Sequence, residues 1–254
     1  MNSFITRHSK KIISAAVVFA WLGVWQLAAA LINEPLFFPS LTSVIKTLWL
    51  LLGTADFYTA VANSLLRIML GYLASVIVGS ALAALAAYSK VARALLHPLM
   101  SVIKATPVAS FIVLALILVS SKNLSALIAF LMAVPIVYTN TLSGVLAIDK
   151  SMFEAADVYG MAGITRFRYI YFPETFPYFK AGCSVALGLC WKAGVAAEVI
   201  GLSAKSIGEK LYDAKIYLNI PELFSYTLVI VLLSILLEKL VSLLLERLYK
   251  IVVK

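Results

Sequence analysis

Six long apolar runs constrain this chain more than any other feature of its sequence. A helix needs about 20 predominantly apolar residues to cross a hydrocarbon core about 30 Å thick. Hydrophobic residues make up 63% of the 254 residues and charged residues 13%, against about 45–50% and about 25% in soluble proteins. The sequence therefore predicts an all-α membrane protein with six transmembrane helices, at about residues 12–32, 61–88, 99–119, 124–148, 177–200 and 221–240.

The distribution of basic residues predicts how these helices are oriented. The formal net charge is +9, but the basic residues stand between apolar runs and do not gather on one polar face, so nucleic acid is not expected as a partner. Loops rich in Lys and Arg stay in the cytoplasm, and twelve basic residues fall on one side of the predicted membrane against five on the other. Both termini lie on the richer side and are predicted to be cytoplasmic.

The first apolar run has an alternative interpretation. Arg7, Lys10 and Lys11 precede it, and Ala28 and Ala30 lie near its end, a pattern that also suits a secretory signal. The run is longer than the apolar core of such a signal, and its removal would weaken the charge asymmetry. We therefore count it as a transmembrane helix.

Two connections on the predicted outer side carry amphipathic helices. Apolar residues recur at helical spacing from Thr42 to Gly53 and again from Ser206 to Leu218, where Ser206 and Glu209 form a capping box. These helices either pack on the lipid surface or form a gate or docking surface for an extracytoplasmic partner. The chain divides accordingly into a first part at 1–60, with the first span and first outer helix, and a five-helix core at 61–254.

The largest predicted cytoplasmic loop, residues 149–180, has internal structure of its own. Ser151 and Glu154 fit a capping box, and Gly160 is placed to end the helix that they begin. A second short helix is predicted from about Thr165 until Pro173 stops it. The apolar and aromatic side chains of this loop predict a docking surface; they are Phe153, Val158, Tyr159 and Met161.

This loop resembles the EAA loop of ABC importer permeases. The pattern of that loop is EAA, three residues, Gly, nine residues, Ile, one residue and Leu-Pro. Phe172 replaces the usual leucine, and the matching positions are Glu154, Ala155, Ala156, Gly160, Ile170 and Pro173. Each residue also has a purely structural interpretation, in which Glu154 caps, the alanines favour helix and Gly160 makes a turn.

The resemblance extends over most of the chain and is strongest to permeases of the nitrate, sulfonate and taurine branch. Where that branch often carries Trp-Phe-Gly after the third span, this chain has Leu118-Val119-Ser120-Ser121. The substrate stays open among sulfonates, taurine, nitrate or bicarbonate, and vitamin precursors. The residues that carry the resemblance outside the EAA loop are Phe38-Pro39-Ser40, Ser64 to Arg67, Gly71, Pro98, Lys104, Pro107, Pro135, Asn140, Gly144, Trp191-Lys192 and Ala197-Glu198.

The resemblance also implies partners for the chain. Permeases of this family work as dimers, here expected to be a homodimer, in the bacterial cytoplasmic (inner) membrane. An ATPase subunit dimer, which binds ATP and Mg, docks on the EAA loop, with Tyr159 among the docking residues. A separate extracytoplasmic solute-binding protein delivers the solute. The chain itself needs no cofactor.

Ionisable residues and prolines at membrane depth are candidates for the translocation path. Charged groups there must face protein or water, and a proline frees a carbonyl that needs a new partner. Lys104, Lys192 and Glu198 could line a path or gate, or could pair structurally; a relay of these three would instead suit an ATP-independent secondary transporter or channel. Together with the resemblance, this gives the path candidates Lys104, Pro107, Pro135, Asn140, Trp191, Lys192 and Glu198.

Two kinds of motif are absent from the sequence. No G-x-x-x-x-G-K-[ST] phosphate loop occurs, so an ATPase would have to be a separate chain. No HExxH and no Cys and His cluster occur, and His8 and His97 are the only histidines. The sequence therefore predicts a transport subunit without enzyme activity or metal.

Overall fold

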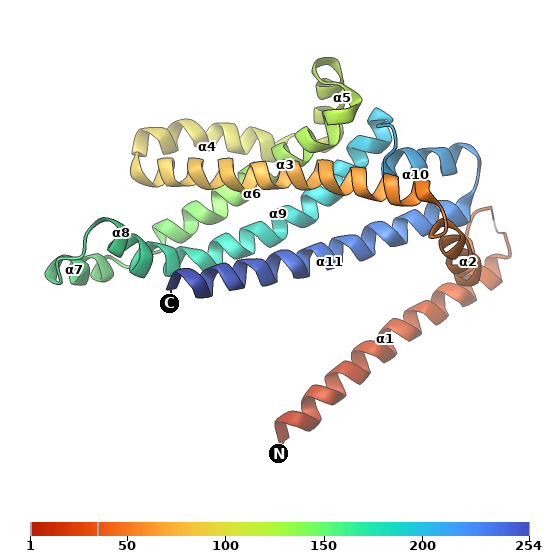
Figure 1. Cartoon of the computed structure of the whole chain (residues 1–254), viewed down its shortest axis with the longest axis horizontal. Helices are drawn as coiled ribbons and strands as arrows, with labels where there is room; N and C mark the ends of the chain where they lie inside the picture. Colours follow the sequence, from red (N-terminus) through yellow and green to blue (C-terminus); the bar gives the residue numbers. More distant parts are fainter. Residues whose placement is uncertain (1, 35, 254) are drawn as a thin grey trace. The chain divides into compact units, whose positions relative to one another are not determined.

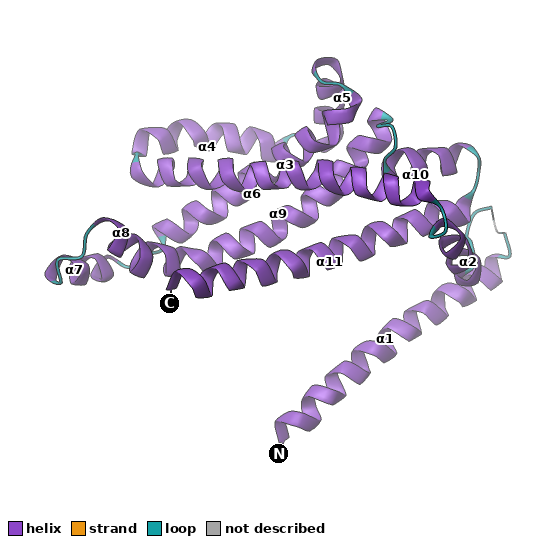
Figure 2. Cartoon of the chain, viewed as in Figure 1, coloured by secondary structure: helices purple, strands orange, loops and turns teal. Residues whose placement is uncertain are grey.

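The computed structural model describes residues 2–34 and 36–253, and the regular structure within these residues is entirely helical (Figure 2). The chain forms two compact units, Met1–Tyr58 with Lys210–Val229, and Thr59–Glu209 with Ile230–Lys254. The predicted all-α class is confirmed. The division at residues 1–60 and 61–254 stays a prediction, and the compact units differ from it in placing 210–229 with the N-terminal segment.

The first unit contains α1 (Asn2–Ile32), α2 (Leu41–Leu51) and the beginning of α11 (Ile220–Val253). Helix α2 is the predicted first outer helix, and it begins where the Ser40 hydroxyl accepts the Ser43 amide at 3.2 Å. Side chains of this kind satisfy amides that have no partner within a helix. The start of α2 is therefore set by its own sequence.

An aromatic cluster holds the first unit together. The ring of Trp25 in α1 lies 6.1 Å from Phe38 and 5.7 Å from Phe224 in α11, and the last two are 6.0 Å apart. Ser225 donates a hydrogen bond to the carbonyl of Val44 in α2 at 3.0 Å. Aromatic pairs at these distances contribute about 0.5–1.5 kcal/mol beyond their buried area.

The second unit is a helical bundle in which α6 and α9 pack closely. A Cβ atom on Gly182 of α9 would lie 2.7 Å from Cβ of Asn140 in α6, so only glycine permits this approach. Figure 1 shows the helices of this unit and the turn of α5 away from α4. They are α3 (Ala55–Tyr88), α4 (Lys90–Ala105), α5 (Val108–Leu118), α6 (Ser121–Leu146), α7 (Lys150–Val158), α8 (Gly163–Arg166), the π-helix η1 (Phe167–Tyr171), α9 (Phe172–Gly201), the start of α10 (Ile207–Ile216) and the rest of α11.

Four helical stretches among the described residues are long and apolar enough to cross a membrane. They are α3, α6, Gly163–Gly201 and α11, and the bent pair α4 and α5 would make a fifth. The apolar part of α1, Ala16–Ile32, is a shorter helix. The structure thus supports a multi-pass membrane protein, while the count of six spans and the cytoplasmic termini stay predictions.

The two mid-span prolines have different effects. Pro107 stands at the start of α5, where the chain bends by 102° between α4 and α5. Pro135 lies inside the continuous helix α6 and is buried, and its own carbonyl accepts the Thr139 hydroxyl at 2.5 Å. The position of the break could be predicted from Pro107, but the size of the bend could not.

Candidate functional site

Helix α7 carries the Glu-Ala-Ala sequence, and its first residue differs from the prediction. Asp149 caps it, because the Asp149 carboxylate accepts the Ser151 amide at 2.9 Å. The predicted capping box of Ser151 with Glu154 is therefore replaced by a cap two residues earlier. The hydrogen bond from Ser151 stabilises the charged form and lowers the pKa of Asp149 below its ordinary value.

Gly160 ends α7, as predicted. Its φ is +63°, a conformation that only glycine adopts without strain. The amide of Met161 then donates to the carbonyl of Ala156 at 2.8 Å, and the amide of Gly160 donates to that of Asp157 at 3.1 Å. These two bonds form a Schellman motif, which satisfies the last carbonyls of the helix.

The second short helix does not end at Pro173, so that prediction was wrong. Helix α8 continues through η1 into α9, and Pro173 lies in the first turn of α9. In the wider π turn, the amide of Phe172 donates a hydrogen bond to the carbonyl of Phe167. Proline contributes no amide to this turn, and the helix continues through it.

Residues 149–173 contain the Glu-Ala-Ala sequence, and we call them the EAA segment. This segment has a buried face and an exposed face. Ala156 and Ile170 are buried and pack together with Ile148. Tyr159 and Val158 are 79% and 84% exposed. The matched motif therefore serves two purposes, since some of its residues build the segment and others present a surface. Five exposed residues in the second half of α7 and just after it form what we call the exposed surface of α7; they are Glu154, Ala155, Val158, Tyr159 and Gly160.

Arginine side chains fix the EAA segment to itself and to the bundle. Arg166 pairs with the carboxylate of Asp157 and donates to the carbonyl of Met161 at 3.0 Å. Arg168 donates from Nε to the carbonyl of Val252, near the end of α11, at 2.6 Å. Figure 1 shows α7 and α8 beyond the ends of the long helices of this unit, on the side of the C-terminus. The exposed surface of α7 is thus presented on a fixed support.

Some path candidates lie together between α4 and α6. The Lys104 ammonium, which is exposed, donates to the Thr139 hydroxyl at 2.7 Å, and Thr139 in turn donates to the carbonyl of Pro135. The Thr139 hydroxyl is thus held by a backbone carbonyl one turn earlier in α6, and it orients the Lys104 ammonium. Asn140 is partly buried and donates to the carbonyl of Ile136 at 2.9 Å.

The other candidates lie along α9 and do not form a relay. Lys192 is exposed, whereas Trp191 is buried and donates from its indole to the carbonyl of Ile230 at 2.9 Å. Glu198 is fully buried, and its hydrogen bonds go to Ser64 and to a backbone amide. No ion pair joins Lys104, Lys192 and Glu198 among the described residues.

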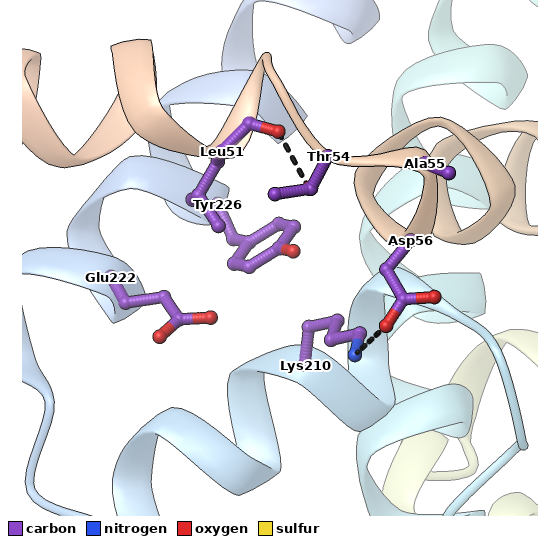
Figure 3. A pocket seen from close by; sticks show the side chains of 7 residues that line it. All are labelled: Leu51, Thr54, Ala55, Asp56, Lys210, Glu222 and Tyr226. Carbon is purple, nitrogen blue, oxygen red and sulfur yellow. Dashed lines mark hydrogen bonds and ion pairs between the residues drawn. The ribbon is translucent and has the colours of Figure 1, made fainter.

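A cavity of about 390 Å³ in the first unit is lined by one basic side chain, Lys210, and by two acidic ones, Asp56 and Glu222 (Figure 3). Asp56 Oδ2 lies 3.6 Å from Lys210 Nζ, and Glu222 accepts from Asn219 at 2.6 Å. Asp56 and Glu222 occupy the first turns of α3 and α11, where the helix dipole favours negative charge. Lys210 thus pairs with Asp56, and Glu222 is held by a neutral amide. The lining residues are Leu51, Thr54, Ala55, Asp56, Lys210, Glu222 and Tyr226.

A larger cavity of about 730 Å³ lies in the second unit beside the EAA segment. Its walls are mostly apolar and aromatic, and they come from α3, α6, η1 and α9. Phe172 in this wall stacks on Tyr249 of α11, and the Phe176 ring contacts both of these rings at a tilted angle. Within the described residues, no three His, Cys, Asp or Glu side chains are placed to hold a metal.

The family model of binding-protein-dependent transport system inner membrane components matches residues 75–254. The chain belongs to this family. The matched region contains α4 to α11 and the whole EAA segment. The chain is thus a transport subunit with several membrane-spanning helices, of the ABC importer permease type that the EAA loop indicated.

Several relatives support the branch that the sequence indicated. A nitrate import permease protein of Leptolyngbya laminosa is 28% identical over 218 residues, which are 81% of this chain and 76% of the relative. A Bacillus subtilis protein assigned to aliphatic sulfonate transport as a permease is 23% identical over 95% of this chain and 87% of its own length.

A protein of Brucella melitensis assigned as an ABC transporter permease is 24% identical over 95% of this chain and 96% of its own length. Among solved structures, that of an amino acid ABC transporter with histidines is similar with a TM-score of 0.58. It is 19% identical and covers 77% of this chain and 93% of its own, so this likeness supports the fold.

Sequence reasoning missed the role of one residue and overlooked another. Ser64 was noted only as part of the resemblance, but it is buried in α3 and bonds Glu198 of α9, a contact between residues 134 apart that no local pattern reveals. Asp149 was overlooked as a cap, although an Asp before a helix is a recognised signal. The first omission reflects a distant contact, and the second reflects a choice between neighbouring caps.

Proposed function

We propose that this chain is the permease subunit of an ATP-driven importer, which carries a small anion through the bacterial inner membrane. Two copies would form the translocation path, and an ATPase dimer would supply ATP and Mg²⁺. An extracytoplasmic binding protein would deliver the solute. The chain would contribute the path and the docking surface and would have no catalytic residue.

The observation that carries this proposal is the exposed surface of α7. Val158 and Tyr159 project large apolar and aromatic side chains into solvent beside the exposed carboxylate of Glu154. Exposed side chains of this kind on a rigid support are typical of interface anchors. Ala156, Ile170 and Arg166 support this surface from behind, since Ala156 and Ile170 are buried and Arg166 pairs with Asp157.

The choice of an anion rests on relatives and on exposed lysines. Two of the relatives are named for nitrate import and for aliphatic sulfonate transport. Lys104 is exposed and oriented by Thr139, and Lys192 is exposed on α9. An exposed ammonium on the path would attract an anionic solute.

The test is co-purification of the ATPase subunit with wild-type chain and with surface variants of α7. Glu154→Lys and Tyr159→Ala should lose the ATPase while still inserting into the membrane. Tyr88→Ala is the matched control, because Tyr88 is 92% exposed at the end of α3 and lies outside the EAA segment. This control should retain the ATPase.

A different result would overturn the proposal. If the wild-type chain purifies alone and transports solute without ATP, α7 is not a docking surface for an ATPase. If Tyr88→Ala loses the ATPase as completely as Tyr159→Ala does, binding does not depend on the exposed surface of α7.

A further inference from the structure

The first turn of α10 is held by side chains from two other helices. Glu198 of α9 is fully buried, and its Oε2 atom accepts the Ser64 hydroxyl at 2.6 Å and the Gly208 amide at 3.3 Å. The Ser64 oxygen also accepts the Ile207 amide at 2.9 Å. Ile207 and Gly208 are the first residues of α10, where amides have no partner within the helix.

The rest of this corner is tied down in the same way. The Asn63 side chain donates to the carbonyl of Lys205 at 3.0 Å, and Arg67 donates to that of Ala204 at 3.2 Å. The Ser203 hydroxyl donates to the carbonyl of Ser121 at 2.6 Å. We call Asn63, Ser64, Arg67, Glu198 and residues 203–209 the α10 junction.

The backbones of α9 and α10 touch at this junction. A Cβ atom on Gly208 would lie 2.3 Å from Cβ of Glu198 and 2.6 Å from the backbone of α9. Leu202 and Lys205, in the connection between the helices, have φ angles of +48° and +54°. Such angles are costly for residues other than glycine and persist where the surroundings impose them. The connection therefore holds one conformation.

Helix α9 links this junction to the EAA segment. It continues from η1 without a break and past the internal Pro177, so one continuous helical stretch has Ile170 and Pro173 near one end and Glu198 near the other. A helix of this kind transmits displacement along its length because its backbone hydrogen bonds resist bending.

We infer that Glu198 is a positioning residue that latches the N-terminus of α10 to α3 and α9, so that movement of α9 carries the start of α10 with it. The consequence for transport rests on the proposed function, in which the EAA segment receives the stroke of the ATPase. The latch requires an acceptor oxygen on a side chain as long as that of Glu198. It does not require a proton relay with Lys104 or Lys192.

The first measurement is hydrogen–deuterium exchange by mass spectrometry on the full chain in lipid nanodiscs. Glu198→Ala and Ser64→Ala should raise exchange at residues 206–209 by about tenfold or more, as expected when a buried amide loses its hydrogen-bond acceptor. Glu198→Gln keeps an acceptor oxygen at the same reach and should stay near wild type.

Two further variants keep this test decisive. Ser75→Ala is the matched control for Ser64→Ala, because Ser75 is equally buried in α3 but donates only to the carbonyl of Tyr72 in its own helix. Its exchange at 206–209 should not change. Gly208→Ala keeps the carboxylate and the hydroxyl but forces the helices apart, so it should raise exchange as Glu198→Ala does.

The second measurement uses the assembled complex with its ATPase and binding protein. Glu198→Ala should retain the bound ATPase and its basal hydrolysis but lose most of the stimulation by the loaded binding protein, and Glu198→Gln should restore it. If exchange at 206–209 is unchanged in Glu198→Ala and Gly208→Ala, or is raised in Glu198→Gln, the latch is overturned. If exchange rises but stimulation is intact, the latch does not transmit movement.

The two proposals fail in different ways. A wild-type chain that binds no ATPase contradicts the proposed function, while the exchange measurement still decides whether Glu198 latches α10. A chain that binds ATPase normally and shows unchanged exchange in Glu198→Ala contradicts the latch alone.

Discussion

Helix α7 is capped only by residues next to it in the chain, whereas helix α10 is capped both by its neighbour Ser206 and by side chains from two other helices. The cap of α7 is Asp149 with Ser151, and its last turn closes within Ala156 to Met161. The first amide of α10 bonds a side chain 143 residues away. The α7 end can therefore form a docking surface by itself, whereas the position of α10 depends on the bundle.

The largest effect that tests this contrast compares the two glutamates. Glu198→Ala should lower the free energy of unfolding by about 3 kcal/mol, because two buried donors lose their acceptor at about 1–3 kcal/mol each. Glu154 is exposed, so Glu154→Ala should leave the melting temperature in detergent nearly unchanged. ATPase co-purification should show the reverse order, with loss in the Glu154 variant alone.

The contrast fails if both glutamates behave alike. Equal destabilisation would mean that Glu154 has contacts that hold α7 in place. Equal loss of the ATPase would mean that the α10 junction shapes the docking surface from a distance.

The next effect concerns the end of α7. A Cβ atom on Gly160 would meet nothing within 4 Å, so Gly160→Ala is costly only through its φ of +63°. The cost is about 1–2 kcal/mol, the penalty for a left-handed residue with a side chain. Thermal unfolding and ATPase binding should both decline.

Gly188→Ala is the matched control for this prediction. Gly188 lies inside α9, and a Cβ atom there also meets nothing within 4 Å. Alanine at an ordinary helical position should stabilise the chain by up to about 1 kcal/mol. The same sign for both substitutions would show that the turn at Gly160 does not require glycine.

The sequence could predict the locally capped parts of these two regions better than the parts held by distant residues. The end of α7 at Gly160 and the start of α10 at the capping residues Ser206 and Glu209 depend on near neighbours in the chain. Both boundaries were predicted close to where they lie, and the Ser206 hydroxyl accepts the Glu209 amide at 3.1 Å. Even there the detail differed, since Glu209 accepts the amide of Lys205, at 2.6 Å, and not that of Ser206. The π turn before Pro173 overrode the ordinary effect of proline, because a wider turn removed the conflict.

The α10 junction could not be predicted because its partners are distant in the sequence. Glu198 stood out as a charge at membrane depth, and the expectation that it must have a partner was sound. Its partners proved to be a hydroxyl and one backbone amide, which carry no charge pattern in the sequence. Sequence reasoning thus identified the unusual residue, and only the structure identified its role.

A smaller effect concerns Lys104, a candidate for the translocation path. Replacing Lys104 by Met removes an exposed ammonium that Thr139 orients, and anion uptake by the complex should fall about fivefold, equivalent to about 1 kcal/mol of lost attraction. Lys46→Met is the control, since Lys46 is likewise exposed but belongs to α2 and is not one of the path candidates. Equal losses in both variants would argue against a role for Lys104 on the path.

The smallest effect is a pH dependence confined to α7. The pKa of Asp149 is below its ordinary value of 3.8 because its carboxylate accepts the Ser151 amide. The stabilisation by this cap is therefore complete above that ordinary value and is lost as the pH falls through the lower, folded-state pKa. Asp149→Asn keeps an acceptor that does not titrate. The measurement is the exchange rate of residues 150–152 in the wild type divided by that in the Asn variant at the same pH. This ratio should rise only below about pH 4. The amides of 206–209 should show no such rise, because the side chains that cap α10 do not include Asp149. A rise at both sites would mean that acid loosens the whole bundle, and the local character of the α7 cap would be refuted.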